Sequence, residues 1–222
     1  MIYLDHAATT PVSPEAAQAM VEVLTKRYGN PSAQYALGRE AKALTDRSRE
    51  TIAGALGCKP EQLFFTSCGT EGDNWAIRAA LHQNRRVGKH IVTTAVEHSA
   101  VLQCVKQLER EGYTASYVKP DGEGRISAEA VLDAVREDTA LVSVMLVNNE
   151  TGAVFPVAEI AAGLKDKPAL LHTDAVQGFL KIPFTVKSLG ADYVTLSAHK
   201  VGGPKGIGAL YIGGRAKNTL PL

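Results

Sequence analysis

The sequence is short of cysteine, of excess charge of either sign and of long apolar runs. Its 222 residues hold three scattered cysteines, Cys58, Cys68 and Cys104, without a C-x-x-C pair, which argues against a disulfide framework or a zinc or redox motif. Lys plus Arg number 24 and Asp plus Glu 23, so the chain lacks the basic excess typical of nucleic-acid-binding proteins. No apolar run approaches the roughly 18 residues of a membrane span, and no signal-peptide pattern opens the chain. We therefore expect a cytoplasmic protein without nucleic-acid or membrane partners.

Three common catalytic and nucleotide-binding motifs are also missing. The chain has no G-x-x-x-x-G-K-[ST] loop of nucleoside triphosphatases and no G-x-G-x-x-G between a strand and a helix, as dinucleotide sites have. It also lacks the G-x-S-x-G elbow of α/β-hydrolases. The function must therefore be sought in other polar motifs.

Strand-like and helix-like segments alternate along the chain, which predicts βαβ units and a mainly parallel sheet. We expect seven strands, at 62–66, 90–95, 114–118, 140–147, 169–173, 192–197 and 208–212. We expect helices at 13–28, 38–56, 71–84, 99–111, 128–136 and 157–165. The last strand follows the 202–206 loop too closely for a helical crossover, so it should run antiparallel to its neighbour. The predicted fold class is a three-layer α/β/α protein.

Five polar motifs each follow one of the predicted strands. They are Ser67–Thr70, Glu97–His98, Asn148–Glu150, Asp174–Gln177 and Ser197–Lys200. Ligands of open parallel sheets bind at the carboxyl ends of the strands, so these motifs should meet at one edge. That edge would carry an amine, a carboxylate, an imidazole, a carboxamide and a hydroxyl-tipped loop, which together predict a pyridoxal 5'-phosphate (PLP) site.

The lysine and the carboxylate define the predicted chemistry. Lys200 directly follows an apolar strand, and desolvation there favours the neutral amine that forms a Schiff base with an aldehyde cofactor. Lys205 is the rival, but it lies in a turn between a proline and a glycine and should be solvated. Asp174 can serve as a helix cap, or it can keep the pyridine nitrogen of PLP protonated so that the ring becomes an electron sink.

The remaining motif residues each have a structural and a functional interpretation. Thr70 fits a capping pattern at a helix expected to begin at Glu71, and a helix start preceded by a glycine, here Gly69, also suits a phosphate. His98 is either a partly buried histidine or a residue that stacks on the cofactor and carries protons. Gln177 can reach the phenolic oxygen of the cofactor. No motif decides alone, but their joint placement at strand ends favours PLP.

These residues resemble the cysteine desulfurases of the class-V aminotransferase group, within fold type I of the PLP enzymes. The matching segments are Tyr3–Thr10, Gly29–Ser32, Thr66–Asn74, Val96–Ser99, Val147–Gly152, His172–Gln177 and Ser197–Tyr211. The match spans nearly the whole chain, and the stretch from Gly203 to Tyr211 is similar to the nitrogen-fixation and iron–sulfur-assembly branch.

The resemblance implies a role for each matching position. Lys200 would form the internal aldimine, Asp174 would pair with the pyridine nitrogen, Gln177 with the phenolic oxygen, and His98 would stack on the ring. The phosphate would be bound by Thr70, Ser197 and His199, beside Gly69, and Asn149 would contact cofactor and substrate. The implied reaction converts L-cysteine to L-alanine and passes persulfide sulfur to an acceptor or scaffold protein of iron–sulfur assembly. A homodimer is expected for the intact protein.

One departure from the family concerns the end of the chain. Family members continue beyond the equivalent of Leu222 with a nucleophilic cysteine, a substrate-binding arginine and most of a small domain. We therefore expect 13–222 to be the PLP-binding large domain and 1–12 a segment that would pack on the small domain. The 222-residue chain alone should be inactive. Two alternatives are open: another class-V PLP enzyme, such as a selenocysteine lyase or aminotransferase, or a non-catalytic PLP-binding fragment.

Overall fold

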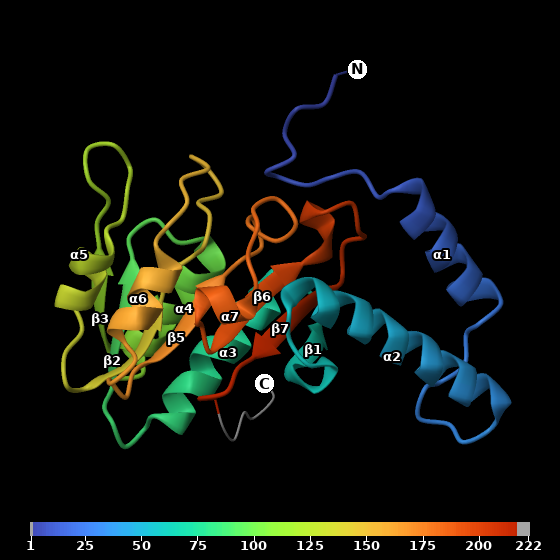
Figure 1. The fold of residues 1–222 in the computed structure, drawn as a ribbon, viewed down its shortest axis with the longest axis horizontal. Coiled ribbons are helices and arrows are strands. Elements are labelled where there is room, and N and C mark those ends of the chain that lie inside the picture. Colours follow the sequence, from blue (N-terminus) through green and yellow to red (C-terminus); the bar gives the residue numbers. More distant parts are fainter. Residues whose placement is uncertain (1, 217–222) are drawn as a thin grey trace.

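A seven-stranded mixed sheet forms the centre of the molecule in the computed structural model (Figure 1). The structure describes residues 2–216, so the outermost ends of the two predicted domains, Met1 and 217–222, lie outside the described residues. The strand order is β1-β7-β6-β5-β4-β2-β3. The strands are β1 (Leu63–Thr66), β2 (His90–Thr94), β3 (Thr114–Val118), β4 (Thr139–Ser143), β5 (Leu170–Asp174), β6 (Tyr193–Ser197) and β7 (Gly208–Ile212).

Seven α-helices and two short 3₁₀ helices are described within residues 2–216. The α-helices are α1 (Pro14–Thr25), α2 (Ala36–Leu56), α3 (Gly69–Gln83), α4 (Ser99–Arg110), α5 (Ala128–Asp133), α6 (Val157–Gly163) and α7 (Val186–Leu189). The 3₁₀ helices are η1 (Pro60–Gln62) and η2 (Ala198–Lys200). The four-residue α7 and both 3₁₀ helices were not predicted, because elements this short carry no readable periodicity.

The predicted strand directions are confirmed. β2, β3, β4, β5 and β6 pair in parallel, whereas β7 pairs antiparallel with β6 on one side and with β1 on the other. Six strands therefore share one direction and β7 opposes them. The carboxyl ends of β1, β2, β4, β5 and β6 lie at the same edge of the sheet, which is where the polar motifs follow.

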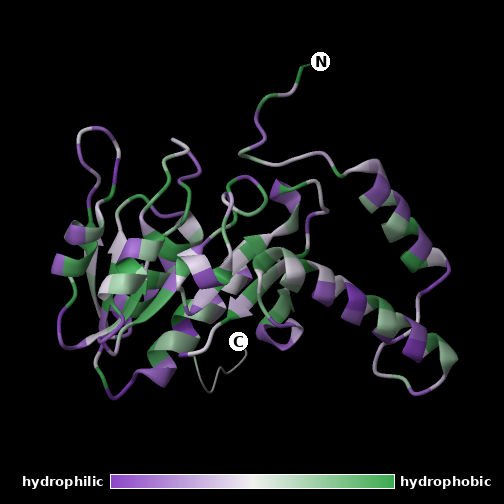
Figure 2. Cartoon of the chain, in the orientation of Figure 1, coloured by the Kyte–Doolittle hydropathy of each residue, from purple (hydrophilic) through white to green (hydrophobic). Residues whose placement is uncertain are grey.

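Two apolar layers cover the sheet, because alternate strand residues face opposite sides. Leu141, Leu170 and Tyr193 pack in one cluster with α3 and α4. Their chain neighbours, such as Val142 and Leu171, pack in the other cluster with residues of α2, α5, α6 and α7. Hydrophobic residues accordingly concentrate in the central strands in Figure 2. The three-layer α/β/α prediction is confirmed.

The strand predicted at 140–147 is wrong in its second half, since β4 ends at Ser143. The chain continues extended beside β5, where the Val144 and Leu146 amides donate to β5 carbonyl oxygens. On the other side β2 has ended, and the Met145 amide donates instead to the Glu97 carboxylate at 3.0 Å. A side chain thus replaces the neighbouring strand, and the ladder stops.

Helix boundaries follow the expected signals in most places. Ser13 caps α1 by accepting from the Ala16 amide at 3.1 Å. Gly57 ends α2 in a left-handed conformation with φ of 70°, which glycine adopts at little cost. The first helix ends at Thr25 instead of about Tyr28, and the helix expected at 128–136 ends at Asp133.

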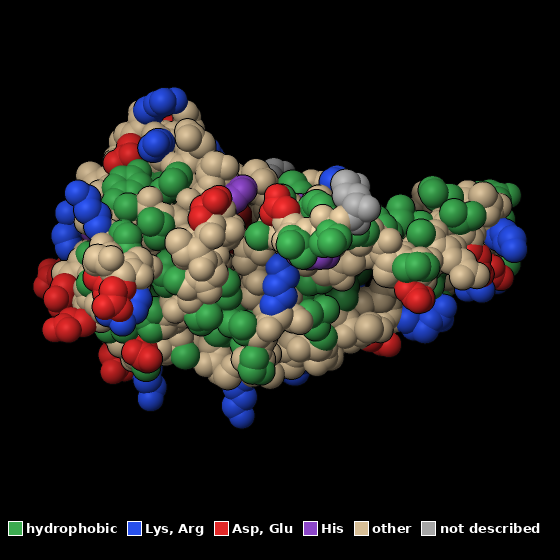
Figure 3. All heavy atoms as spheres, turned by 90° about the horizontal axis from the view of Figure 1, so that it is seen from above, with side chains coloured by type: hydrophobic (Ala, Val, Ile, Leu, Met, Phe, Trp, Pro, Cys, Tyr) green, Lys and Arg blue, Asp and Glu red, His purple; other side chains and the backbone are tan. Residues whose placement is uncertain are grey.

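Helix α1 projects away from the sheet together with the start of α2 (Figure 1). None of its residues is buried, and its Val21 and Leu24 side chains are largely exposed. Figure 3 shows hydrophobic side chains gathered over this projecting end. No helix within residues 2–216 is long and apolar enough to cross a membrane.

The segment before α1 returns to the body of the protein at the turn after β6. The Thr10 amide donates to the His199 carbonyl at 2.8 Å, and the Ser13 amide donates to the Gly202 carbonyl at 2.8 Å. These bonds place residues 7–13 against η2, at the edge where the predicted site lies.

Candidate functional site

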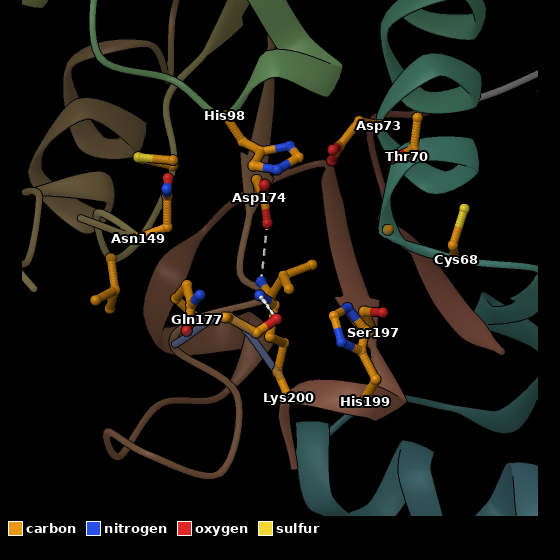
Figure 4. Close-up of a pocket in the computed structure, with 15 residues that line it drawn as sticks. Cys68, Thr70, Asp73, His98, Asn149, Asp174, Gln177, Ser197, His199 and Lys200 are labelled. Carbon is orange, nitrogen blue, oxygen red and sulfur yellow. Dashed lines mark hydrogen bonds between the residues drawn. The ribbon is translucent and has the colours of Figure 1, made fainter. Parts of the chain in front are cut away.

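A cavity of about 260 Å³ opens at the carboxyl edge of the sheet. It is lined by side chains or backbone from all five strand-end segments and from the N-terminal segment (Figure 4). The lining residues are Ala8, Cys68, Gly69, Thr70, Asp73, His98, Met145, Val147, Asn149, Asp174, Val176, Gln177, Ser197, His199 and Lys200. All nine residues that we predicted as site residues are therefore brought together around one cavity.

Lys200 lies at the end of η2, immediately after β6. Its Nζ donates to the carbonyl oxygens of Ala7 and Ala8, at 2.5 and 2.8 Å. Burial lowers the pKa of the Lys200 amine, and the Asp174 and Asp5 carboxylates oppose this shift. The neutral amine is therefore more accessible here than on an ordinary surface lysine. Lys205 is exposed and does not line the cavity.

Asp174 ends β5 at the floor of the cavity. Its Oδ1 accepts from the Val176 amide at 2.9 Å, which fixes the carboxyl group. Burial raises the pKa of Asp174 to about 7, and the nearby Asp73 adds to the increase. A cation placed against this carboxyl group would relieve both effects, because opposite charge favours the ionised form. The floor of the cavity is thus suited to a positively charged ring nitrogen.

Gln177 and Lys200 donate hydrogen bonds to the same oxygen. The Gln177 Nε2 donates to the Ala7 carbonyl oxygen at 2.7 Å, and this oxygen also accepts from Lys200. The Gln177 Oε1 accepts from Lys181 Nζ at 2.7 Å. The Gln177 amide and the Lys200 amine therefore both donate to one oxygen atom, the Ala7 carbonyl oxygen.

The opposite wall of the cavity is the start of α3. The prediction that this helix begins at Glu71 with Thr70 as its cap is wrong: α3 begins at Gly69, with Cys68 as N-cap residue and no side-chain cap bond. Glu71 supplies the local closure instead, since its Oε2 accepts from the Ser67 amide at 2.6 Å. Thr70 is not the cap residue; it lies in the first turn of α3 and lines the cavity.

Small and hydroxyl-bearing groups surround this helix start. A Cβ added at Gly69 would lie 2.9 Å from Val176 Cγ2, so only glycine fits without a shift. The buried Ser197 Oγ has no hydrogen-bond partner within the described part of the chain. First-turn amides of a helix have no partner inside the helix, and the dipole there favours an anion. This corner of the cavity is a suitable anion site.

His199 borders the same corner. Its Nδ1 lies 3.2 Å from Thr9 Oγ1, which orients the ring. Burial lowers the pKa of His199, and the positive charge of Lys200 adds to the decrease. The ring is therefore neutral near pH 7 and can present one N–H donor.

His98 is the N-cap residue of α4 and faces the cavity from above Asp174 (Figure 4). Its Nδ1 accepts from the Ala100 amide at 3.2 Å. The neutral ring must therefore carry its proton on Nε2. The buried Glu97 beside it accepts from Thr94 Oγ1 at 2.7 Å, which holds this strand end in place.

Asn149 reaches the cavity from a turn that its neighbour organises. The Asn148 Oδ1 accepts from the amides of Glu150 and Thr151, at 3.0 and 2.9 Å. Its Nδ2 donates to the Val96 carbonyl at 3.0 Å and so ties this turn to the segment that carries His98. The Asn149 side chain donates to Glu150 Oε1 at 2.6 Å.

Our sequence reasoning missed a buried polar pair at the cavity, formed by Asp73, which lines it, and His172. Asp73, on α3, places Oδ1 3.4 Å from the Nε2 atom of His172, on β5. Burial lowers the pKa of His172 to about 4 and raises that of Asp73 to about 7. With a neutral imidazole, this contact is not an ion pair at neutral pH. The sequence held one signal for Asp73. It lies four residues, about one helical turn, after Gly69, and so on the same face of the helix.

The donor set of the cavity fits PLP. Lys200 offers an amine for the aldehyde, and Asp174 offers a carboxylate for the pyridine nitrogen. In PLP the phenolic oxygen lies next to the aldehyde that would react with the lysine. The Ala7 carbonyl oxygen likewise lies next to the Lys200 amine and accepts from Gln177, so the phenolic oxygen could take its place. The unpartnered Ser197 hydroxyl and the α3 start suit its phosphate.

Comparison with known proteins places the chain among PLP-dependent relatives. The family model described as "Aminotransferase class-V" matches residues 2–222. A cysteine desulfurase of Trichormus azollae is 47% identical over 96% of this chain and 53% of its own length. The cysteine desulfurase IscS of Methanosarcina thermophila is 43% identical over 95% of this chain and 52% of its own. The chain thus spans about half the length of these curated relatives.

Solved structures agree in fold. A NifS-like protein superposes with a TM-score of 0.92 at 38% identity, covering 100% of this chain and 60% of the other. A structure titled "SspA in complex with cysteine" gives a TM-score of 0.93 at 34% identity, covering 99% of this chain and 65% of the other.

Proposed function

Because this chain belongs to the class-V aminotransferase family, whose cofactor is PLP, we propose that it serves a cysteine desulfurase reaction. In this reaction L-cysteine gives up its sulfur to an acceptor thiol and leaves as L-alanine. The observation that carries the proposal is the single cavity in which the Lys200 amine, the Asp174 carboxyl and the Gln177 amide meet. The desulfurases among the relatives support the choice of reaction.

Bound PLP would supply an electron sink for negative charge at the substrate carbon next to the amine. Lys200 would hold the cofactor through its amine, and burial, which lowers the pKa of that amine, favours its neutral, nucleophilic form. When the substrate amine takes its place, the same Nζ is free to accept and return a proton. Lys200 is therefore the proposed proton carrier.

Asp174 would hold the protonated pyridine nitrogen of PLP at the floor of the cavity. Its carboxyl group is fixed by the Val176 amide, so it does not have to reorganise when the charge appears. Ser197, Thr70 and His199 would hold the phosphate, near Gly69 and the first turn of α3. This wall fixes the cofactor against rotation.

His98 and Asn149 close the open side of the cavity. The His98 ring would lie against the cofactor plane, with Nε2–H facing the cavity because Nδ1 is engaged by Ala100. That N–H can donate a hydrogen bond near the substrate, and the ring could carry a proton there only if Nδ1 gave up the Ala100 amide and took up a proton of its own. Asn149 would orient the substrate through its amide, whose turn is fixed by Asn148.

We further propose a sulfur acceptor, an oligomeric state and a location for the protein. The sulfur acceptor is a protein thiol that serves iron–sulfur assembly, the working unit is a homodimer, and the site of action is the cytoplasm. The IscS names among the relatives support the first of these.

The test uses the purified chain with PLP, L-cysteine and an excess of dithiothreitol as external thiol. The thiol takes the substrate sulfur, a second thiol releases it as sulfide, and alanine is the expected carbon product. Formation of a keto acid in place of alanine would favour an aminotransferase. Absence of a visible band from bound PLP would contradict the whole proposal. The rate is compared with that of free PLP, and a rate no higher than that of free PLP would agree with the expectation that the 222-residue chain alone is inactive.

A further inference from the structure

Lys181 touches the site without lining it. It lies four residues beyond Gln177, and its Nζ donates to Gln177 Oε1 at 2.7 Å. The Gln177 side chain is buried, and its Nε2 points the other way, to the oxygen that it shares with Lys200. The amide of Gln177 is thus held between an ammonium group and the cavity.

The chemistry of the two groups fixes the direction of the amide. An ammonium group has three donors and no acceptor, so it can face only the oxygen end of a carboxamide. The NH₂ end must then point into the cavity. We propose that Lys181 is a positioning residue that holds Gln177 with its amide donor toward the cofactor's phenolic oxygen. This inference rests on the proposed PLP function.

Without the ammonium group, the two ends of the amide would be nearly equivalent in shape. A rotated Gln177 would present Oε1 to the phenolic oxygen, and two acceptors would then face each other. Only one of the two rotations can support the cofactor, and Lys181 selects it. A neutral side chain at position 181 removes that selection.

The backbone between the two residues is shaped for this contact. Leu180, at φ 58°, is the sole non-glycine residue with positive φ among residues 2–216. The amides of Lys181 and Ile182 both donate to the Gly178 carbonyl at 3.0 Å. This tight turn brings residue 181 back toward residue 177. A left-handed conformation at leucine is costly, and such strain concentrates at functional sites.

The charge environment agrees with this role. Burial lowers the pKa of the Lys181 amine, and the positive charge of Lys200 lowers it further. Lys200 in turn faces the carboxylates of Asp174 and Asp5. The charge of Lys200 repels the Lys181 ammonium group, and the hydrogen bond to Gln177 Oε1 offsets this repulsion.

The experiment compares Lys181→Met, Lys181→Gln and Lys181→Arg in the full chain, with Lys187→Met as a matched control on α7. The readouts are the PLP dissociation constant and the pH midpoint at which the visible absorbance of bound PLP changes. We expect Lys181→Met and Lys181→Gln to weaken PLP binding about tenfold, the loss of one hydrogen bond, and to raise the pH midpoint. Lys181→Arg should restore both values, and Lys187→Met should match the unchanged protein.

A double-mutant cycle separates positioning from a simple field effect. If Lys181 acts through the amide, Lys181→Met should change little when Gln177→Ala is already present. An effect of full size in the Gln177→Ala background would overturn the proposal, as would wild-type values for Lys181→Met. Failure of the unchanged protein to bind PLP would instead overturn the proposed function, so the two failures are distinct.

Discussion

The side-chain amine of Lys200 and the carbonyl oxygen of Ala7, 193 positions apart in the chain, are joined by a hydrogen bond inside the candidate site. Gln177 donates to the same oxygen. The backbone of the N-terminal segment thus occupies the point where two cavity donors converge. PLP bound in this cavity would have to displace the Ala7 carbonyl from both donors.

Lys200 should be the residue that PLP labels. Borohydride reduction of the PLP-treated chain followed by peptide mapping should find the adduct on Lys200, because its amine is half-buried and reaches the cavity. Lys205 is exposed and lies outside the cavity lining. An adduct on Lys205 with Lys200 unmodified would contradict the assignment.

Replacing Asp174 with asparagine should impair the electron sink. The fixed carboxylate stabilises positive charge on the cofactor ring, and such a contribution is worth about 10²–10³ in rate. The measurement is exchange of the Cα hydrogen of L-alanine with deuterated water, catalysed by the PLP-loaded chain. Asp174→Asn should slow this exchange while the far-ultraviolet circular dichroism stays unchanged. Exchange at the unmodified rate would refute the role.

The three cysteines should differ in reactivity. Burial raises the pKa of Cys104 to about 11, and burial also raises the pKa of the half-buried Cys58. Cys68 lines the cavity at the start of α3. Iodoacetamide at pH 7.5 should modify Cys68 first, since thiolates react and the other two are suppressed. Bound PLP should protect Cys68; faster labelling of Cys104 would contradict the described burial.

The buried carboxyl groups should lower stability as pH rises from about 4 to about 8. The pKa of Asp73 is raised to about 7 from an ordinary 3.8, so the folded protein keeps a proton that the unfolded chain releases. Its stabilisation is complete below about pH 4 and is lost as pH rises through 7. Asp174, with its pKa raised to about 7, and Glu97, raised to about 8, act in the same direction. His172 opposes them only below pH 6.5.

The measurement is the melting temperature of the PLP-free chain between pH 4.5 and 8.5, a range that spans the interval between the unfolded and folded pKa of Asp73. Asp73→Asn should melt with a weaker pH dependence than the unchanged protein, because each pKa unit corresponds to about 1.36 kcal/mol. Asp166→Asn, at an exposed loop position, is the matched control and should leave the slope unchanged. Equal slopes for all three proteins would show that Asp73 ionises normally in the fold.

The sheet was predictable from the sequence because its strands are bounded by clear signals. The bounds 114–118 and 208–212 match β3 and β7, and the short 202–206 loop correctly indicated an antiparallel last strand. Sequence periodicity could not predict the early end of β4. That end depends on the Glu97 carboxylate, which is distant in sequence and accepts from the Met145 amide. Nor could periodicity predict that Glu71 closes the start of α3 in place of Thr70.

That the nine residues would lie around one cavity was predictable for the same reason. Parallel strands bring their carboxyl ends together, so motifs that follow strands must meet. The contact between Asp73, which lines the cavity, and His172 could not be predicted, because it depends on the packing of α3 against β5. The contact of Lys200 with Ala7 was likewise hidden, since no pattern links positions so far apart.

The antiparallel β7 also sets the order in which the protein can be completed on the ribosome. Strand β1, with Phe64 and Phe65, pairs with β7 and with no other strand in the described sheet. Among the described strands β7 is synthesised last, so the backbone of β1 stays unpaired while the central strands assemble. Long-range pairing of this kind is slow and exposes apolar segments to aggregation. The pairing of β1 with β7 should therefore form last, and β1 should be the segment that most needs chaperone protection.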